Sequence, residues 1–231
     1  MKFISLCLLL SLGLVASSTA MAQSTNSVYI DQSGDNSSIN ITQFGLGNSL
    51  NTDSNHAIFN GNNQSVTISQ IGNQNSTNVT LTGTGTSLTN NITGGFNTTN
   101  ITCGTGGASA TGSCNDSVLT ANATGSNNAL SINGTSKNTS TILLNGNYNS
   151  ASITSTTDNL LGSTATINAT GSSNVVSINQ SGPAGANGHS ADVEITGSSN
   201  VIGVTQSGSS DSLVKISSSG SNNNITVHSG N

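Results

Sequence analysis

Aliphatic residues alternate with polar residues along most of this chain, in short runs that end at glycine or asparagine. Clear examples are Val28-x-Ile30, Ile39-x-Ile41, Val66-x-Ile68 and Ile202-x-Val204. Alternation with a period of two predicts β-strands that have one apolar face. Each repeated segment spans about eleven to thirteen residues, which is too short to bury that face alone, so it is stable only when stacked on neighbouring copies. The pattern therefore predicts an all-β fold, a β-solenoid of strand-turn-strand coils.

A glutamine follows the aliphatic pair by two positions in five of these segments. These residues are Gln32, Gln43, Gln70, Gln180 and Gln206. Because side chains alternate across a strand, each glutamine faces the same way as the aliphatic pair. A buried amide costs free energy unless it is hydrogen-bonded, and identical amides stacked at the strand spacing of ~4.8 Å bond to one another. We therefore predict an inward glutamine ladder between strands that are in register.

The spacing Gly-x-x-Asn recurs throughout the chain. It occurs at Gly45/Asn48, Gly72/Asn75, Gly94/Asn97, Gly112/Asn115, Gly125/Asn128, Gly146/Asn149, Gly171/Asn174, Gly197/Asn200 and Gly220/Asn223. Glycine and asparagine tolerate the positive φ that a sharp reversal usually requires, so these sites are predicted to be turns that close each coil. About sixteen strand units pair into about eight coils, a stack of roughly 38 Å that offers both ends for stacking on further copies.

A second class of segment, such as TILLNGNYN and ADVEITGSSN, lacks the glutamine and passes almost directly from strand to turn. This class dominates residues 76–174. We therefore predict that the amide ladder is interrupted in the middle of the stack and is best formed near both ends.

The first 22 residues have the features of an export signal: Lys2, an apolar run from Phe3 to Val15 and small residues up to Ala22. The predicted organisation is a cleaved signal peptide over 1–22 and one solenoid repeat domain over 23–231. No later run of 18 apolar residues follows, so we expect no membrane span and an extracellular location.

Charge is sparse after the signal segment. Two lysines, Lys137 and Lys215, stand against eight acidic residues, which gives a net charge of −6. Nucleic acid is therefore not expected as a partner, because phosphate binding needs clustered cations.

Two insertions depart from the repeat. Residues 103–114 form a Gly/Ala/Ser-rich loop flanked by Cys103 and Cys114, which in an exported protein are predicted to form a disulfide, with a metal pair or a reactive thiol as the alternatives. A zinc site is disfavoured because no histidine lies nearby. Residues 182–189 hold the only proline and are predicted to bulge out of a corner.

The three histidines, His56, His189 and His228, stand alone without carboxylate or cysteine partners at ligand spacing. They are predicted to be surface residues. No metal site, cofactor or catalytic group is expected, and we predict that the protein is not an enzyme.

The segment SSINITQFGLGN, in which Ser37 is followed by Gln43-x-Gly45-x-x-Asn48, resembles the repeat of curlins, the subunits of bacterial curli amyloid fibres. The segment VYIDQSGDN resembles a unit of the nucleating curli subunit. The resemblance implies a β-solenoid that stacks end to end into an extracellular fibre of biofilm matrix, with roles in adhesion and surface colonisation. It also implies further copies of itself, a nucleating subunit, an export channel and chaperones as partners.

By the same resemblance, the family's ladder glutamines correspond to Gln32, Gln43, Gln70, Gln180 and Gln206. Its ladder asparagines correspond to Asn36, Asn48, Asn75 and Asn200.

Two classes of function are consistent with these features. The first is a structural fibre subunit, in which the unpaired strand edges at both solenoid ends act as templates for the next molecule. The alternative is a monomeric β-solenoid that binds ice or carbohydrate through rows of outward threonines or asparagines. Regular outward Thr-x-Thr on one flat face would favour the binder, whereas threonines along the sequence, as in STATINAT, are frequent but irregular.

Overall fold

The computed structural model describes residues 26–34, 36–52, 56–61, 63–81, 85–103, 114, 116–134, 137–156, 162–182 and 188–230. In these ranges the chain forms nineteen β-strands and no helix, as an all-β fold requires. None of the described segments is therefore a helix that could cross a membrane. The predicted signal peptide, residues 1–22, lies outside the described residues.

Two long parallel sheets hold all but two of the strands. The eight-stranded sheet contains, in spatial order, β3 (Ser38–Phe44), β6 (Ser65–Asn73), β8 (Ser87–Gly95), β10 (Val118–Thr124), β12 (Asn138–Asn145), β14 (Ser163–Thr170), β16 (His189–Thr196) and β18 (Ser212–Ser219). The nine-stranded sheet contains β1 (Ser27–Val28), β4 (Ser49–Leu50), β7 (Ser76–Val79), β9 (Thr98–Thr102), β11 (Ala129–Asn133), β13 (Ser150–Ser155), β15 (Val175–Ser181), β17 (Val201–Ser207) and β19 (Asn224–Gly230). The remaining two strands, β2 (Ile30–Asp31) and β5 (Ala57–Ile58), pair with each other.

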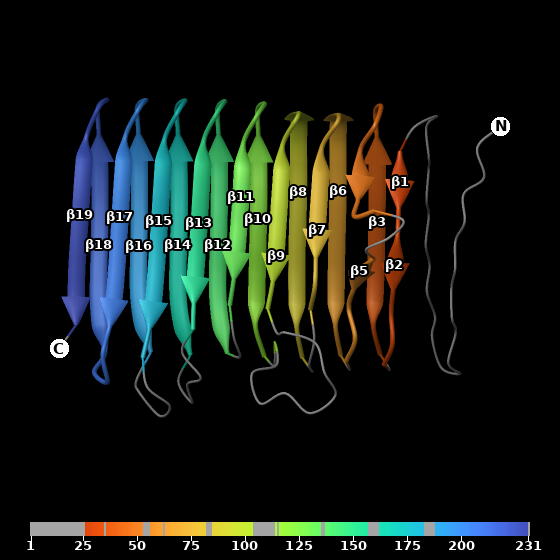
Figure 1. The fold of residues 1–231 in the computed structure, drawn as a ribbon, viewed down its shortest axis with the longest axis horizontal. Coiled ribbons are helices and arrows are strands. Elements are labelled where there is room, and N and C mark those ends of the chain that lie inside the picture. Colours follow the sequence, from red (N-terminus) through yellow and green to blue (C-terminus); the bar gives the residue numbers. More distant parts are fainter. Residues whose placement is uncertain are drawn as a thin grey trace.

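The chain alternates between the two long sheets, so a strand of the eight-stranded sheet and the next strand of the nine-stranded sheet make one coil (Figure 1). From β3/β4 to β18/β19 the described strands form eight such coils, separated by seven steps. The predicted β-solenoid is thereby confirmed.

The core is a set of side-chain columns that run along the stack. One column consists of Ile101, Ile132, Ile153, Ile178 and Val204 in successive strands of the nine-stranded sheet. Each of these side chains is at most 1% exposed. Burial of one such side chain stabilises the fold by about 2 kcal/mol, and period-two alternation places its neighbours in the strand on the outer surface.

The two corners of each coil differ in how much length variation they accept. The corner after each strand of the eight-stranded sheet, here called the constant corner, always has the spacing Gly-x-x-Asn. The return corner, which leads back to the eight-stranded sheet, varies: residues 134–137 connect β11 to β12, whereas residues 103–117 connect β9 to β10. Successive asparagines of the constant corner are consequently between 21 and 31 residues apart along the chain.

Both predicted insertions fall at the return corner. Cys103 and Cys114 are described, but residues 104–113 between them lie outside the described residues, as do residues 183–187 of the second insertion and the Asn115 turn site. Because the return corner accepts these additions, the strands on either side keep their register.

Candidate functional site

Nine asparagines form a hydrogen-bonded ladder along the constant corner. They are Asn26, Asn48, Asn75, Asn97, Asn128, Asn149, Asn174, Asn200 and Asn223. In each step, the backbone N–H of one asparagine donates to the side-chain Oδ1 of the asparagine one coil nearer the N-terminus, at 2.9 to 3.1 Å. From Asn75 onward, Nδ2 donates to the same oxygen. Since a backbone N–H can only donate, its partner must be the amide oxygen, which defines the orientation of every side chain.

Each interior asparagine also bonds in the opposite direction. From Asn48 to Asn200, Nδ2 donates to the carbonyl oxygen of the turn glycine one coil nearer the C-terminus, at 2.7 to 3.1 Å. These seven side chains are at most 1% exposed. A single amide therefore joins three consecutive coils through buried hydrogen bonds, each of which would be costly to leave unmade.

The glycines of the constant corner allow this close approach. Gly125 has a φ of 122°, and a Cβ built on it would lie 1.9 Å from the carbonyl oxygen of Gly146 in the next coil. The same overlap, at 1.8 or 1.9 Å, exists at every turn glycine from Gly45 to Gly197. Only glycine permits both the backbone conformation and the spacing that brings the next carbonyl within reach of the asparagine amide.

Three of the four asparagines matched to the curlin ladder, Asn48, Asn75 and Asn200, lie in this column. Asn36 does not: it is exposed, has a φ of 56° and lies before β3 at the return corner. The first described member of the ladder is Asn26, which accepts from the backbone N–H of Asn48.

The ladder also runs unbroken through the middle of the stack, by way of Asn97, Asn128, Asn149 and Asn174. From the sequence these four residues were predicted only as turn residues, and the interruption predicted for the middle of the stack concerned the glutamines. The signal that could have found them is the Gly-x-x-Asn spacing, which the glutamine-free segments keep.

The glutamines form two separate pairs, one toward each end of the stack, and no glutamine bond joins them across the middle, where the sequence predicted an interruption. In the eight-stranded sheet, Gln43 Nε2 donates to Gln70 Oε1 at 3.1 Å, and in the nine-stranded sheet Gln180 Nε2 donates to Gln206 Oε1 at 3.0 Å. All four side chains are buried. Register explains why each pair stops, because the next strand places Ile92 beside Gln70, whereas Ser155 lies beside Gln180.

Gln32 lies apart from both pairs, after β2 in the first described half-coil. It is half-buried, and its Nε2 has no hydrogen-bond partner among the described residues.

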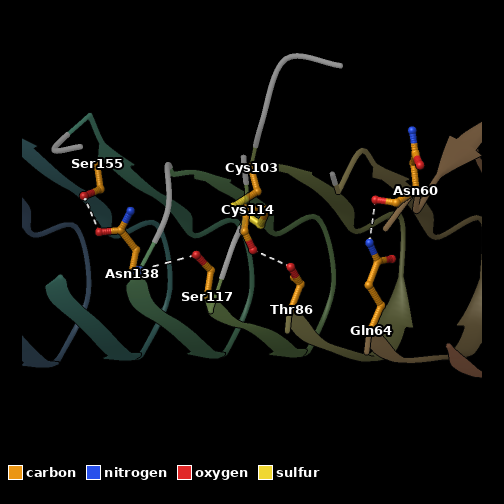
Figure 2. The surroundings of a disulfide bond; sticks show 8 residues. All are labelled: Asn60, Gln64, Thr86, Cys103, Cys114, Ser117, Asn138 and Ser155. Atoms are coloured by element: carbon orange, nitrogen blue, oxygen red, sulfur yellow. Dashed lines mark hydrogen bonds between the residues drawn. A yellow bond between two sulfur atoms is a disulfide. The ribbon is translucent and has the colours of Figure 1, made fainter. Parts of the chain in front are cut away.

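The return corner holds a mixed set of polar groups around the two cysteines (Figure 2). Cys103 and Cys114 lie side by side, with Cα atoms 5.0 Å apart and sulfur atoms at bonding distance. The Thr86 hydroxyl donates to the Cys114 carbonyl, and Ser155 Oγ donates to Asn138 Oδ1 at 3.0 Å. This corner therefore has no counterpart to the uniform asparagine column of the constant corner.

Asn90 is a buried polar residue that was not predicted from the sequence. Asn90 occupies a core position between Ile68 and Ala121 in the neighbouring strands, and it is fully buried. Its Oδ1 accepts from Thr77 Oγ1 at 3.3 Å, and Thr77 in turn accepts from Gln70 Nε2 at 2.6 Å. This chain extends the Gln43–Gln70 pair into the third coil.

His189 is buried, not at the surface where the sequence analysis placed it. It is 1% exposed; its Nε2 lies 3.0 Å from the Ser181 carbonyl, and its Nδ1 lies 2.9 Å from Ser212 Oγ. A carbonyl only accepts, so Nε2 carries the proton of the bond to Ser181. The Ser212 oxygen also accepts from Gln206 Nε2 at 3.0 Å, which connects this histidine to the second glutamine pair.

Charged groups are few and lie on the outside. Lys215 Nζ is 3.3 Å from Asp192 Oδ2 on neighbouring strands, and His56 Nδ1 is 2.8 Å from Asp31 Oδ1. No cluster of three or more potential metal ligands exists within the described part of the chain. The site that the described residues build is therefore a repeated hydrogen-bonding column that ends at the two ends of the solenoid.

Replacement of Gln206 by leucine should lower the free energy of unfolding by about 2 kcal/mol, because it removes the donor to the Ser190 and Ser212 carbonyls and one of the three acceptors of Gln180 Nε2. Urea unfolding followed by circular dichroism would measure the change. Gln74→Leu is the matched control, since Gln74 is exposed at a turn, and it should change stability by less than about 0.5 kcal/mol. Equal effects of the two variants would contradict the buried pair.

Comparison with known proteins gives one match. The family model of the curlin associated repeat matches residues 24–45, a segment that includes β1, β2, β3 and Gly45. No curated protein matches the chain, and no solved structure does either. The matched repeat and the solenoid fold together point to a structural protein rather than an enzyme.

Proposed function

We propose that this curlin-like repeat protein is a secreted structural subunit of an extracellular, amyloid-like fibre, which polymerises by end-to-end stacking of solenoids. The proposal includes a role of the fibre in biofilm matrix and surface adhesion. It also includes export through a signal peptide over 1–22 that is cleaved to leave a solenoid domain over 23–231, with loops at 103–114 and 182–189.

The observation that carries the proposal is the asparagine ladder, which joins every described coil in the same way. A ladder of identical steps has no preferred length. Adding a further coil at either end should therefore change the free energy by about as much as adding a coil in the interior.

The C-terminal end has the properties of such an acceptor. Ile202 and Val204 in β17 are 1% exposed, whereas Ile225 and Val227, which lie beside them in β19, are only half-buried. An exposed strand edge with half-buried aliphatic side chains is a template for another strand. Docking of a second copy would complete the burial of these side chains.

In the exported chain, we further propose that Cys103 and Cys114 are joined by a disulfide that ties the long return corner between β9 and β10. Their adjacency supports this, and an oxidising compartment permits it.

The fibre proposal is tested by incubation of the purified mature protein, followed by thioflavin binding, electron microscopy and fibre diffraction. We expect fibres with a meridional reflection near ~4.7 Å. Protein that remains monomeric for days without this reflection would contradict the proposal.

A second candidate function, binding of ice or carbohydrate by a monomer, is favoured by one surface. On the outer face of the eight-stranded sheet, five threonines occupy one position in five consecutive strands: Thr67, Thr89, Thr120, Thr141 and Thr166. Thr139 and Thr164 form a second pair on the same face, two residues before Thr141 and Thr166 in their strands. Threonines that are irregular along the sequence are therefore regular across the sheet, because coils of different length place them in register.

This candidate predicts that soluble monomer inhibits ice recrystallisation or binds insoluble cellulose. Thr120→Lys, in the middle of the row, should abolish either activity while the fold is kept, since the side chain is on the outer face. Ser131→Lys, on the outer face of the opposite sheet, is the control and should have no effect.

A further inference from the structure

The asparagine ladder has a direction. From Asn48 to Asn223, the backbone N–H of each ladder asparagine donates toward the N-terminal end of the solenoid, and each Oδ1 that it meets accepts from the C-terminal side. In this set of bonds the donors point to the N-terminal end and the acceptors to the C-terminal end, whereas the Nδ2 bonds to the turn glycines run the opposite way. The two ends of the solenoid are different surfaces.

At both ends of the solenoid, some hydrogen-bonding side-chain groups have no partner among the described residues. At the N-terminal end, Asn26 Nδ2 and Gln32 Nε2 are buried donors without a hydrogen-bond partner in the described chain. At the C-terminal end, Asn223 donates from its N–H and Nδ2 to Asn200 Oδ1, whereas no described donor reaches its own Oδ1. The unused groups are thus donors at one end and an acceptor at the other.

We propose that the fibre joint is head-to-tail, with β19 of one copy paired in parallel with β1 and β2 of the next, so that Asn223 stacks directly on Asn26. This inference rests on the proposed fibre function and specifies its joint. Asn223 Oδ1 would accept from the backbone N–H and Nδ2 of Asn26 in the next copy, as Asn200 Oδ1 accepts from Asn223. The asparagine column and the nine-stranded sheet would then continue from one molecule into the next, whereas β18 of one copy and β3 of the next would lie two strand spacings apart, because the eight-stranded sheet has one strand fewer.

Side chains at the same joint also match. The register between β17 and β19, and between β1 and β4, places Ile225 over Val28 and Val227 over Ile30 of the next copy. All four of these side chains are half-buried and pack against the core in the single molecule. The same register places the Ser229 hydroxyl over Gln32, whose Nε2 is one of the unpartnered donors.

The nine-stranded sheet is the one that makes this joint. Among the described strands it begins with β1, half a coil before the eight-stranded sheet begins with β3, and it ends with β19. Its two edges are therefore the outermost strands at both ends.

The two other arrangements bring like groups together. A joint between two C-terminal ends would oppose two Asn223 carbonyl oxygens, and a joint between two N-terminal ends would oppose two sets of buried donors. Either one leaves the ladder groups unpaired and makes the facing strands antiparallel. The geometry thus predicts a fibre in which all subunits point the same way.

Cysteine cross-linking tests the joint in the full mature chain. Ser27 and Asn224 are the outward residues that follow the two ladder asparagines, so they would be direct neighbours across a head-to-tail joint. Adjacent strands lie ~4.8 Å apart, within the Cα separation that a disulfide accepts. The double variant S27C/N224C should therefore give a ladder of covalent trimers and larger species when assembled protein is oxidised and run on a denaturing, non-reducing gel.

Three controls define the result. S27C alone and N224C alone should remain monomeric on the gel after oxidation, because a head-to-tail joint never brings two identical residues together. S27C/T226C is displaced by two residues, which exceeds the disulfide range, and should give at least about tenfold less cross-linked product. Assembly of every variant is followed by thioflavin binding.

The possible outcomes separate the joint from the fibre. Fibres in which a single variant forms covalent dimers, or in which S27C/T226C cross-links as well as S27C/N224C, would overturn the head-to-tail register and leave the fibre function standing. Fibres of S27C/N224C without any cross-link would do the same. Failure of the unmodified protein to form fibres would instead refute the proposed function, and the joint with it.

Discussion

Gly125→Ala should prevent the constant corner from closing and lower the free energy of unfolding by at least about 4 kcal/mol. The new Cβ would lie 1.9 Å from the Gly146 carbonyl oxygen and 2.7 Å from its carbon, both of which are backbone atoms that cannot rotate away. The φ of 122° adds strain, because residues with a side chain rarely adopt it. Two coils would have to separate, and that separation would also break the bond from Asn128 Nδ2 to Gly146.

Urea unfolding of the freshly purified monomer would measure this loss, and the same preparation should assemble slowly or not at all. Gly203→Ala is the matched control. Gly203 lies within β17, where the nearest atom to a new Cβ is Ser177 Oγ at 3.7 Å, an ordinary contact. This control should change stability by less than about 0.5 kcal/mol, and similar losses in both variants would show that the turn geometry is not the cause.

Asn128→Leu should cost on the order of 4 kcal/mol, although the side chain keeps the same branched skeleton. The substitution removes the acceptor of the Asn149 N–H and Nδ2, and it removes the donor to the Gly146 carbonyl. These groups are buried, and each one left unpaired costs about 1 to 3 kcal/mol. Because the lost bonds join three coils, the defect should also divide the protected core into two parts.

Hydrogen exchange combined with urea unfolding would detect both effects. Amides near Asn97, Asn128 and Asn149 should lose protection first in the variant. Asn127→Gly is the control, since Asn127 is exposed with a φ of 57° that glycine adopts without strain, and it should behave like the unmodified protein. Uniform loss of protection along the whole solenoid would contradict a local role of the ladder.

The predicted fold followed from local rules. Alternation in segments such as Val66-x-Ile68 identifies the inward face of a strand, and the glutamine two positions later shares that face whatever lies in the next coil. Gln43, Gln70, Gln180 and Gln206 are accordingly buried. The turn glycines could likewise be predicted from the sequence, because only a few residue types adopt the positive φ of these turns.

Local sequence does not predict which residue of the next coil lies beside a given residue. Gln70 lies beside Ile92, and Asn90 lies beside Ile68, only because β6 and β8 pair with this particular register. That register depends on the length of the intervening coil and on where its extra residues are accommodated. Neither quantity is a local property of the sequence.

The sequence by itself determined that the chain forms short strands with one apolar face and glycine turns, since these follow from side-chain alternation and allowed φ values within a few residues. Only the tertiary structure decided which amides stack. Insertions of different length are absorbed at the return corner, so asparagines 21 to 31 residues apart meet at the constant corner, whereas glutamines with the same local pattern meet only in pairs. The physical reason is that a ladder needs the same residue at the same height in consecutive coils, and height along the stack is set by strand pairing between distant segments.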